Sequence, residues 1–409
     1  MRPPTPTGTN RHLRRLAGAW LCVGLLVGGA ACGPDEPDGG EVAAVDGAPV
    51  EIGERLLSIG TVEGDPAEML HDVSPPFRAA DGSVVVPLRS EDEIRIFTPE
   101  GDHIRTLGGH GEGPGEFRNL STAWSCGDTI EAWDRGLQRI TRFSPNDEVE
   151  VVTLHYDFEE RPILDQFIGT SSGGWLLTSI ISASLEEGER DEMTVHRFGA
   201  DGDHEVDGFG HTPGMDRAVM PNLRGPLPLS PGARFHEVGG ELYVAETLTP
   251  EVRVYDGAGG LARTINWEPE RIWSPEEAFG RAVEVAEGDR EQPVLRRDAS
   301  FPSDWPQHTS PPDSVPVFSD FMVDDEGFFW IRPYLPERDA LALGGRPGGT
   351  LRTTSGGEWR VLSPEGEEVG RVDVPDGFEP YQISFDEVVG VYRNELGVEF
   401  VHVYHLDRH

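Results

Sequence analysis

Polar and apolar residues alternate with a period of two over many short stretches of the chain, and clusters of Gly, Pro, Asp and Ser separate these stretches. The alternation predicts half-buried β-strands, and the clusters predict turns. One unit recurs along the chain, and its first half is a turn followed by an apolar run. The copies of this half are DGSVVVPL (81–88), GDTIEAWD (127–134), GGWLLTSI (173–180), GGELYVAE (239–246), DEGFFWIR (325–332) and DEVVGVYR (386–393).

The second half of the unit is a strand of alternating polar and apolar residues, followed by a turn and a second, outer strand. Its copies are IRIFTPEGDHIRTLG (94–108), ITRFSPNDEVEVVTL (140–154), VHRFGADGDHEVDGFG (195–210), VRVYDGAGGLARTINW (252–267), WRVLSPEGEEVGRVDV (359–374) and a shortened VHVYHL (401–406). Each unit is one antiparallel blade of four strands joined by hairpins. The fold class is therefore all-β, and six copies predict a six-bladed β-propeller.

The shortened sixth copy lacks its outer strand, and the segment before the first copy supplies a candidate. ERLLSIG (54–60) resembles the outer-strand sequence IRTLG (104–108), although no blade precedes it. Pairing this N-terminal strand with the last blade would close the ring and remove the exposed sheet edges of an open array.

One interval between repeats is longer than the others. Tyr255 and Leu362 hold equivalent positions but are 107 residues apart, whereas the other intervals are 42 to 57 residues. A seventh blade is one explanation. The stretch 274–287 favours another, because it has Ser at the N-cap, Pro at the first helical position and apolar residues near a 3.6-residue period. We interpret 268–316 as an insertion with a short helix and a long loop over the ring.

The N-terminus predicts export. Residues 1–31 have a basic start and an apolar run from Leu16 to Val27 that is too short for an ordinary membrane span, so we interpret them as a signal peptide. Gly29-Ala30-Ala31-Cys32 resembles the lipobox of bacterial lipoproteins, which implies a lipid on Cys32. Residues 32–50 are rich in Gly, Pro and Asp, as expected of a flexible tether, and 51–409 form the propeller. The alternative is a plain signal peptide cut after Ala31.

One crossing between blades carries a more specific pattern. The run Gly111-Glu112-Gly113-Pro114-Gly115-Glu116-Phe117, followed by Asp134 and Arg139, resembles the NHL repeat and related six-bladed propeller lipoproteins. Gly111, Gly113, Pro114 and Gly115 are suited to the sharp bend between blades. Phe117 is expected in the core between blades. The resemblance implies that Asp134 and Arg139 bridge their hairpin. A weaker copy, 208–214, predicts a similar crossing.

The charge balance limits the partners. Acidic residues outnumber basic ones by 73 to 34, giving a formal net charge of −39. Nucleic acid and anionic lipid surfaces are therefore excluded as expected partners, and the lipid anchor is the only expected membrane contact. We expect a monomer. With Cys22 in the signal peptide and Cys32 acylated, Cys126 would stand alone as a small buried side chain.

No recognised catalytic or metal-binding motif occurs in the chain, and no cofactor is predicted. Acidic groups at 324–326 and 386–387 are candidates for channel carboxylates that bind Ca²⁺, although turn chemistry explains them as well. His110 and His211 are candidates for one mouth of the channel. The aromatic residues Trp330, Tyr334, Trp359 and Tyr381 line either a recognition surface or the core.

Two functions follow from these observations. The first is a non-enzymatic binding module at the bacterial cell envelope, facing the periplasm or the cell surface, which binds a protein, peptide or glycan. The alternative is a lactonase or lyase that depends on Ca or Zn in the central channel. The absence of a recognisable catalytic constellation favours binding.

Overall fold

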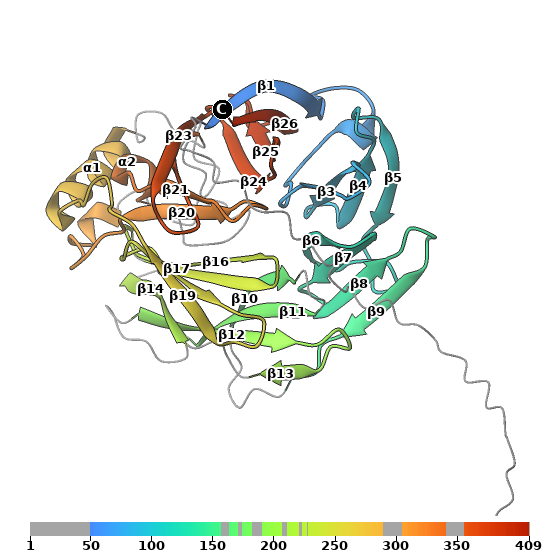
Figure 1. Ribbon diagram of the computed structural model, residues 1–409, viewed down its shortest axis with the longest axis horizontal. Helices are drawn as coiled ribbons and strands as arrows, with labels where there is room; N and C mark the ends of the chain where they lie inside the picture. Colours follow the sequence, from blue (N-terminus) through green and yellow to red (C-terminus); the bar gives the residue numbers. More distant parts are fainter. Residues whose placement is uncertain are drawn as a thin grey trace, which may run out of the picture. The chain divides into compact units, whose positions relative to one another are not determined.

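The computed structural model describes residues 50–156, 163–170, 174–181, 190–206, 211–220, 223–226, 228–288, 305–340 and 356–408. All of them belong to the unit Cys32–His409. They form six antiparallel sheets arranged in a ring, which confirms the predicted six-bladed β-propeller (Figure 1). Five sheets have four strands, and the third blade has additional strands.

The first two blades follow the predicted repeat closely. Blade 1 consists of β2 (Phe77–Arg78), β3 (Val84–Leu88), β4 (Glu93–Phe97) and β5 (His103–Gly108). Blade 2 consists of β6 (Leu120–Cys126), β7 (Thr129–Asp134), β8 (Arg139–Phe143) and β9 (Val149–Thr153). In both blades each strand pairs with its sequence neighbour, as short hairpins require.

Blade 3 departs from the repeat. It consists of β10 (Ile163–Gly169), β11 (Trp175–Ile181), β12 (Arg190–Phe198), β13 (His204–Val206), β14 (His211–Met220) and β15 (Leu223–Pro226). One end of β12 pairs with β13, and the other end pairs with β14, where Thr194 lies opposite His211. The segment expected to cross to the next blade at 208–214 therefore continues the same sheet from His211 onward, and that prediction is wrong. The pairing with β12 outweighs the Gly and Pro turn signal.

The remaining three blades complete the ring. Blade 4 consists of β16 (Ala233–Val238), β17 (Glu241–Glu246), β18 (Glu251–Tyr255) and β19 (Leu261–Asn266). Blade 5 consists of β20 (Phe318–Val323), β21 (Phe329–Pro333), β22 (Gly357–Leu362) and β23 (Glu368–Val374). Blade 6 consists of β24 (Phe378–Ile383), β25 (Glu387–Arg393), β26 (Glu399–Arg408) and β1 (Val50–Ile59).

The N-terminal strand closes the ring as predicted. β1 pairs antiparallel with β26, from Val50 opposite Arg408 to Ile59 opposite Val401. In Figure 1 the blue β1 lies beside the red C-terminal strands. The side chains of Leu57 and Ile59 are buried in a cluster that joins blade 6 to blade 1. Closure therefore depends on apolar packing as well as backbone hydrogen bonds.

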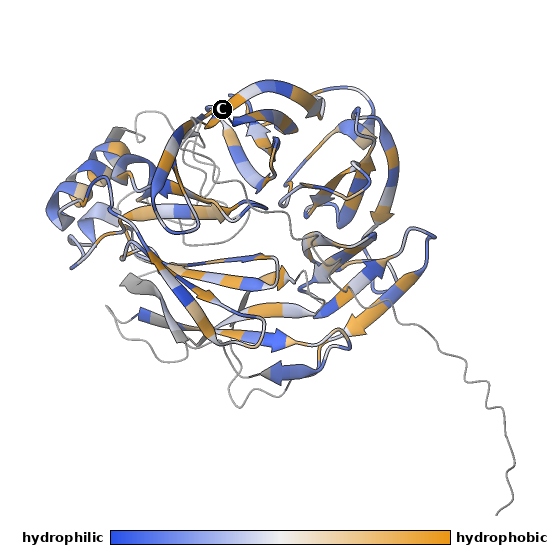
Figure 2. Ribbon diagram, viewed as in Figure 1, coloured by the Kyte–Doolittle hydropathy of each residue, from blue (hydrophilic) through white to orange (hydrophobic). Residues whose placement is uncertain are grey.

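Alternating side chains on each strand pack against the two neighbouring blades. Val84 and Val86 contact the cluster shared with blade 6, whereas Val85 belongs to the cluster shared with blade 2. Figure 2 shows both hydrophobic and hydrophilic residues along the strands of the ring. The middle strands are thus buried on both sides, which explains the continuous apolar runs of the first half of each repeat.

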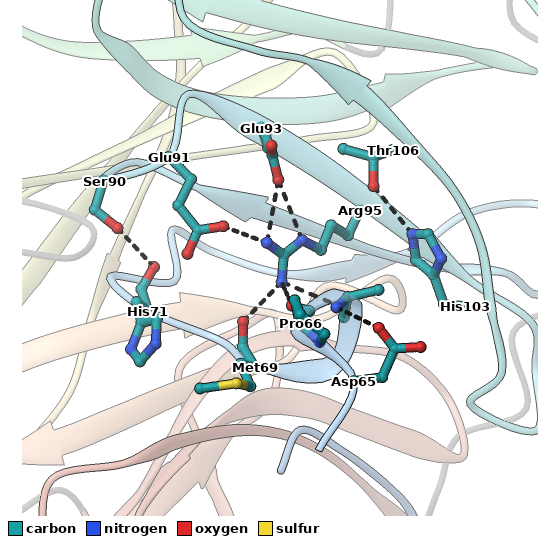
Figure 3. A network of polar contacts seen from close by, with 11 residues as sticks. Asp65, Pro66, Met69, His71, Ser90, Glu91, Glu93, Arg95, His103 and Thr106 are labelled. Atoms are coloured by element: carbon teal, nitrogen blue, oxygen red, sulfur yellow. Dashed lines mark hydrogen bonds and ion pairs between the residues drawn. The ribbon is translucent and has the colours of Figure 1, made fainter. Parts of the chain in front are cut away.

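The crossing from β1 into blade 1 is held by polar contacts, which Figure 3 shows from close by. Asp65 caps the 3-10 helix η1 (Pro66–Glu68) by accepting from the Ala67 backbone N–H. Arg95 Nη1 donates to the carbonyls of Pro66 and Met69 at the end of that turn. Its other nitrogens pair with Glu91 and Glu93. The nearly buried guanidinium therefore fixes the loop that follows the closing strand.

The long interval between blades 4 and 5 holds a helix, as predicted. α1 spans Pro275–Gly288, and the Ser274 hydroxyl accepts from the Glu277 backbone N–H. The described parts of 268–316 contain α1 and the 3-10 turn η4 (Trp305–Gln307) but no strand. A second short helix, α2 (Pro336–Asp339), lies between β21 and β22 and was not predicted.

Because each blade brings the chain back to the end where its inner strand began, the ring has two distinct faces. We call the end where the inner strands begin the insertion face, because α1, α2 and the β14–β15 hairpin all lie in connections at that end. The opposite face carries the short hairpins after each inner strand. Val50, the first residue of β1, lies at the opposite face beside Arg408, which contacts Phe385 and Asp324 in such hairpins.

Candidate functional site

A small apolar core holds the insertion onto the ring. Trp273 and Trp305 are buried with Tyr334, Ala278 and Ala282, and Leu229 and Val315 join them from the chain just before β16 and β20. Trp273 donates its indole N–H to the Tyr334 carbonyl at 3.0 Å, and the Leu229 N–H donates to the Ala340 carbonyl at 2.7 Å. The insertion thus packs against the rim of blades 4 and 5.

Beside this core, charged side chains from three consecutive blades meet at the mouth of the channel. We define the mouth cluster by five residues from blades 4, 5 and 6 and from α2: Arg234, Asp320, Arg332, Asp339 and Glu379. Arg234 Nε lies 3.3 Å from Asp320 Oδ1. Arg332 Nη1 lies 3.6 Å from Glu379 Oε1, and Arg332 Nη2 lies 3.9 Å from Asp339 Oδ1.

Two of these residues are held by bonds to the scaffold. Arg234 donates to the Ser319 carbonyl at 2.7 Å and to the Ala233 carbonyl at 3.1 Å. Asp339 accepts from Arg338 through both of its oxygens and from the Leu335 backbone N–H at 2.9 Å. α2 is therefore anchored by the same carboxylate that faces Arg332.

The surroundings of Glu379 disfavour its charged form. Burial raises the pKa of its carboxyl, and the nearby Asp320 and Asp339 raise it further, whereas Arg332 and Arg393 oppose the shift without cancelling it. A raised pKa means that the surroundings favour the neutral acid over the carboxylate. The attraction of the nearby arginines is thus too small to offset the effect of burial on the pKa of Glu379.

His236 faces blade 5 from the same strand as Arg234. Its ring centroid is 6.4 Å from that of Phe321. Burial lowers the pKa of His236 to about 4, and Asp324 opposes the shift. The imidazole is therefore neutral at pH 7 and adds no positive charge beneath the mouth cluster.

The donor set of the mouth does not fit a channel metal ion. Among the described residues, no three His, Cys, Asp or Glu side chains lie close enough to hold one. Asp320 and Asp339 are each paired with an Arg, and an adjacent guanidinium repels a divalent cation. No chemical step through Ca²⁺ or Zn²⁺ is therefore derived from these residues.

The NHL-like residues make structural contacts. Arg139 donates to the carbonyls of Glu112, Gly113 and Glu116, and Asp134 accepts from the backbone N–H groups of Arg118, Asn119, Gly136 and Leu137. Although the two residues are opposite each other on β7 and β8, their side chains hold the blade crossing rather than each other. Phe117 is fully buried between blades 1 and 2.

The glycines and proline of this motif lie in the crossing that Arg139 holds. Gly115 has a φ of +80°, which residues with a side chain rarely adopt. A Cβ on Gly111 would lie 2.1 Å from Glu116 Oε2, and one on Gly113 would lie 2.9 Å from it. Pro114 stands between these glycines, and the Gly113 N–H donates to Glu116. The run therefore allows a tight loop closed by its own glutamate.

The carboxylates proposed from sequence lie at the opposite face. Asp324 is buried and accepts from Trp330 Nε1 and Arg408, while Glu387 pairs with Arg78 at 2.6 Å. Burial raises the pKa values of Asp325 and Glu326. These residues fasten hairpins and are not gathered into one site. Three members of the mouth cluster, Arg234, Asp320 and Glu379, stand on inner strands, which the repeat copies did not include, and Asp339 lies in the unpredicted helix α2. Arg332 lies within the copy 325–332, but no motif marked it.

The other candidates are dispersed as well. His110 forms a hydrogen bond with Asp92 at 2.7 Å in the crossing between blades 1 and 2. His211 lies in β14, so the two histidines are not in equivalent positions. Trp330 and Trp359 belong to the core between blades 5 and 6, and Tyr334 belongs to the core of the insertion. Tyr381 is half-buried against the cluster between blades 6 and 1.

The expectations for Cys32 and Cys126 have different outcomes. Cys32, the expected lipidation site, and the tether to residue 49 lie outside the described residues. Cys126 is buried at the end of β6, as expected, but it is disulfide-bonded, so the expectation that it stands alone is wrong.

One pair resembles a nucleophile and its base. Ser179 Oγ and His196 Nε2 are 2.7 Å apart on neighbouring strands of blade 3. Both residues are almost completely buried, with relative exposures of 1% and 7%. They lie on the side of the sheet that packs against blade 2, so a substrate has no route to them, and the pair is a core hydrogen bond.

The fold and the mouth cluster define a six-bladed propeller with a polar channel mouth beneath helical insertions. No protein-family profile matches the sequence, and no curated protein matches it. Within the described ranges, no helix has the length and apolar character needed to span a bilayer.

Solved structures share the architecture at low identity. A DUF4221 family member from Bacteroides vulgatus is similar with 11% identity and a TM-score of 0.51, over 88% of this chain and 99% of that one. This likeness shows the fold alone. The calcium-binding protein regucalcin from Agrobacterium tumefaciens is 11% identical (TM-score 0.40; coverage 88% and 96%). Virginiamycin B lyase from Staphylococcus aureus is 8% identical, with a TM-score of 0.38 over 85% of this chain and 98% of that one.

Proposed function

We propose that this protein is an exported, lipid-anchored propeller of the NHL kind that acts as a non-enzymatic binding module at the bacterial cell envelope. The observation that carries the proposal is the mouth cluster, where charged side chains from three consecutive blades meet beside the insertions. Binding sites of propellers and barrels commonly form at such openings, from loops held by a rigid ring.

The position of the tether supports this function. β1 begins at the opposite face with Val50 and runs 10 residues to the insertion face. Ten residues of strand span about 33 Å. The tether of 19 residues (32–50) has a root-mean-square length of about 24 Å. A lipid on Cys32 would therefore leave the mouth cluster directed away from the membrane and open to partners.

The test compares variants of the mouth with a matched control. Purified residues 33–409 are immobilised and exposed to solubilised envelope fractions, using wild type, the double variant Asp320→Asn/Glu379→Gln, and Glu365→Gln. Glu365 is an exposed carboxylate in the β22–β23 turn of the opposite face. We expect a partner retained by wild type and Glu365→Gln and lost from the double variant. Retention by all three proteins would refute the mouth as the binding site.

A second measurement addresses the enzymatic alternative. Metal content by mass spectrometry and melting curves before and after chelation are recorded on the same protein. We expect no stoichiometric metal and an unchanged melting temperature. One Ca²⁺ or Zn²⁺ per chain, with a melt that falls on chelation, would contradict the proposal and lead to lactone and lyase substrates.

A further inference from the structure

The turn before β16 holds a buried residue in an unfavourable backbone conformation. Leu229 is 1% exposed and has a φ of +65°, a left-handed conformation that residues with bulky side chains rarely adopt. The other described residues that combine a positive φ with a side chain are polar: Asp72, Asp92, Gln138 and Asp147. The Leu229 N–H donates to the Ala340 carbonyl at 2.7 Å and the side chain packs in the core of the insertion, so both contacts hold the turn in this conformation.

The same core buries two polar groups that lack a hydrogen-bond partner. Trp305 Nε1 and Tyr334 Oη are buried, and neither forms a hydrogen bond within the described part of the chain. Burial, together with the charges of Asp339 and Glu337, raises the pKa of the Tyr334 hydroxyl well above its usual range, which agrees with apolar surroundings. A buried donor without a partner loses its hydrogen bonds to water on folding, so both groups destabilise the docked insertion.

Few polar contacts offset this cost. Among the described residues, one hydrogen bond joins 272–288 to the rest of the propeller, from Trp273 Nε1 to the Tyr334 carbonyl at 3.0 Å. Arg281 and Glu337 form an ion pair at 3.7 Å, but their side chains are 44% and 39% exposed, and exposed pairs stabilise little. Docking of α1 therefore depends mainly on the apolar core that contains the two unpartnered groups.

The chain is fastened just before this segment. The buried Arg360 guanidinium donates from Nη1 to the Glu268 carbonyl at 2.8 Å, which holds the chain after β19 against blade 5. Arg271 instead belongs to the segment, because its Cζ lies 3.6 Å from the centroid of the Trp273 ring and its Nη2 donates to Glu277 at 2.7 Å. A hinge between Glu268 and Arg271 would let α1 move with these contacts intact.

We propose that residues 271–288 form a conformational switch, which undocks from the rim of blades 4 and 5 as a unit while the six blades stay folded. Undocking brings Trp305 Nε1 and the Tyr334 hydroxyl into contact with water, and water satisfies both groups. It also exposes the apolar side chains of this core beside the mouth cluster. The two states are close enough in free energy for a bound partner to shift the balance between them. The switch does not depend on what the mouth cluster binds.

Native-state hydrogen exchange of purified residues 33–409, read by mass spectrometry, measures the opening of each element. The compared peptides cover α1 and the strands β20 and β21 of blade 5. Urea below the unfolding transition separates local opening from global unfolding, because only global unfolding exposes much surface. The test variant is Tyr334→Phe, which removes the unpartnered hydroxyl and keeps the ring. The matched control is Tyr243→Phe, whose hydroxyl donates to Glu241 at 3.0 Å and accepts from Arg263 at 3.2 Å.

We expect the opening constant of α1 to exceed that of β20 and β21 by at least about tenfold and to change little with urea. Tyr334→Phe should lower the α1 opening constant by about tenfold, because the docked state no longer buries an unpartnered hydroxyl. Tyr243→Phe should leave α1 unchanged, since blade 4 stays folded when α1 opens. Exchange of α1 only with the blades, or an equal response of α1 to both variants, would overturn the switch. Faster α1 exchange in Tyr334→Phe would show a partner for the hydroxyl in the docked state and would overturn it as well.

Discussion

Arg332 Nη1 lies 3.6 Å from Glu379 Oε1, so these two residues of neighbouring blades are close enough to attract but too far apart to form a hydrogen bond. The pair joins the second strand of blade 5 to the inner strand of blade 6. Burial outweighs its attraction and raises the pKa of Glu379.

This imbalance predicts that Glu379→Gln is at least as stable as wild type at pH 7. A carboxyl whose pKa is raised on folding contributes stability below its unfolded pKa, near 4.5, and loses it as the pH rises through the folded pKa. Glutamine mimics the neutral acid. Melting temperatures at pH 4 and pH 7 test the expectation. Relative to wild type, the melting temperature of the variant should be higher at pH 7 than at pH 4. A variant that melts below wild type by a margin that grows toward pH 7 would contradict the expectation.

His236 predicts the opposite pH dependence. Its pKa is lowered to about 4, so the folded protein resists a proton that the unfolded chain accepts near pH 6.5. Its contribution to stability is present above pH 6.5 and is lost as the pH falls toward 4, by about 1.4 kcal/mol per pH unit. Urea unfolding at pH 7 and pH 5 should show a smaller acid loss for His236→Gln than for the half-exposed control His405→Gln.

We expect the substitution of Arg139 to lower the stability of the protein without changing binding at the mouth cluster. Arg139→Ala removes three charge-assisted bonds to the carbonyls of Glu112, Gly113 and Glu116, so we expect the free energy of unfolding to fall by about 2–3 kcal/mol. The control is Arg118→Ala, whose exposed pair with Glu112 is expected to contribute less than about 1 kcal/mol. Equal losses in denaturant titrations would argue against the anchoring role.

Ring closure can be tested with two adjacent leucines of β1. Leu57 is buried between blades 6 and 1, whereas Leu56 is 47% exposed. Leu57→Ala should lower the free energy of unfolding by about 2–5 kcal/mol. Leu56→Ala should change it by less than about 0.5 kcal/mol. Similar values for the two variants would mean that β1 is not part of the cooperative fold.

The lipid anchor predicts both attachment and orientation. Cells fed an alkyne palmitate should label wild type but not Cys32→Ala. In anchored protein, energy transfer from a dye at Glu365→Cys to a membrane dye should exceed transfer from a dye at Leu396→Cys, in the β25–β26 turn of the insertion face. Absence of label would refute the anchor, and equal transfer would refute only the orientation.

The sequence by itself determined the number of blades, their hairpins, the closing strand and the helix at 275–288. These features are local, because a period of two, turn residues and an N-cap act within a few neighbouring positions. The same local reading missed α2 and misplaced 208–214, where pairing of β14 with β12 outweighed a turn signal. The resemblance to NHL blades implied that Asp134 and Arg139 bridge their hairpin, whereas their side chains hold the crossing loop.

Only the tertiary structure decided the candidate site. Arg234, Asp320 and Glu379 stand on inner strands that are far apart in sequence, and no motif along the chain marks any of them. Their meeting depends on the closed ring, which brings the starts of successive inner strands to one mouth. Whether such charges pair, remain open or bind a ligand follows from distances and burial, which no pattern along the chain contains.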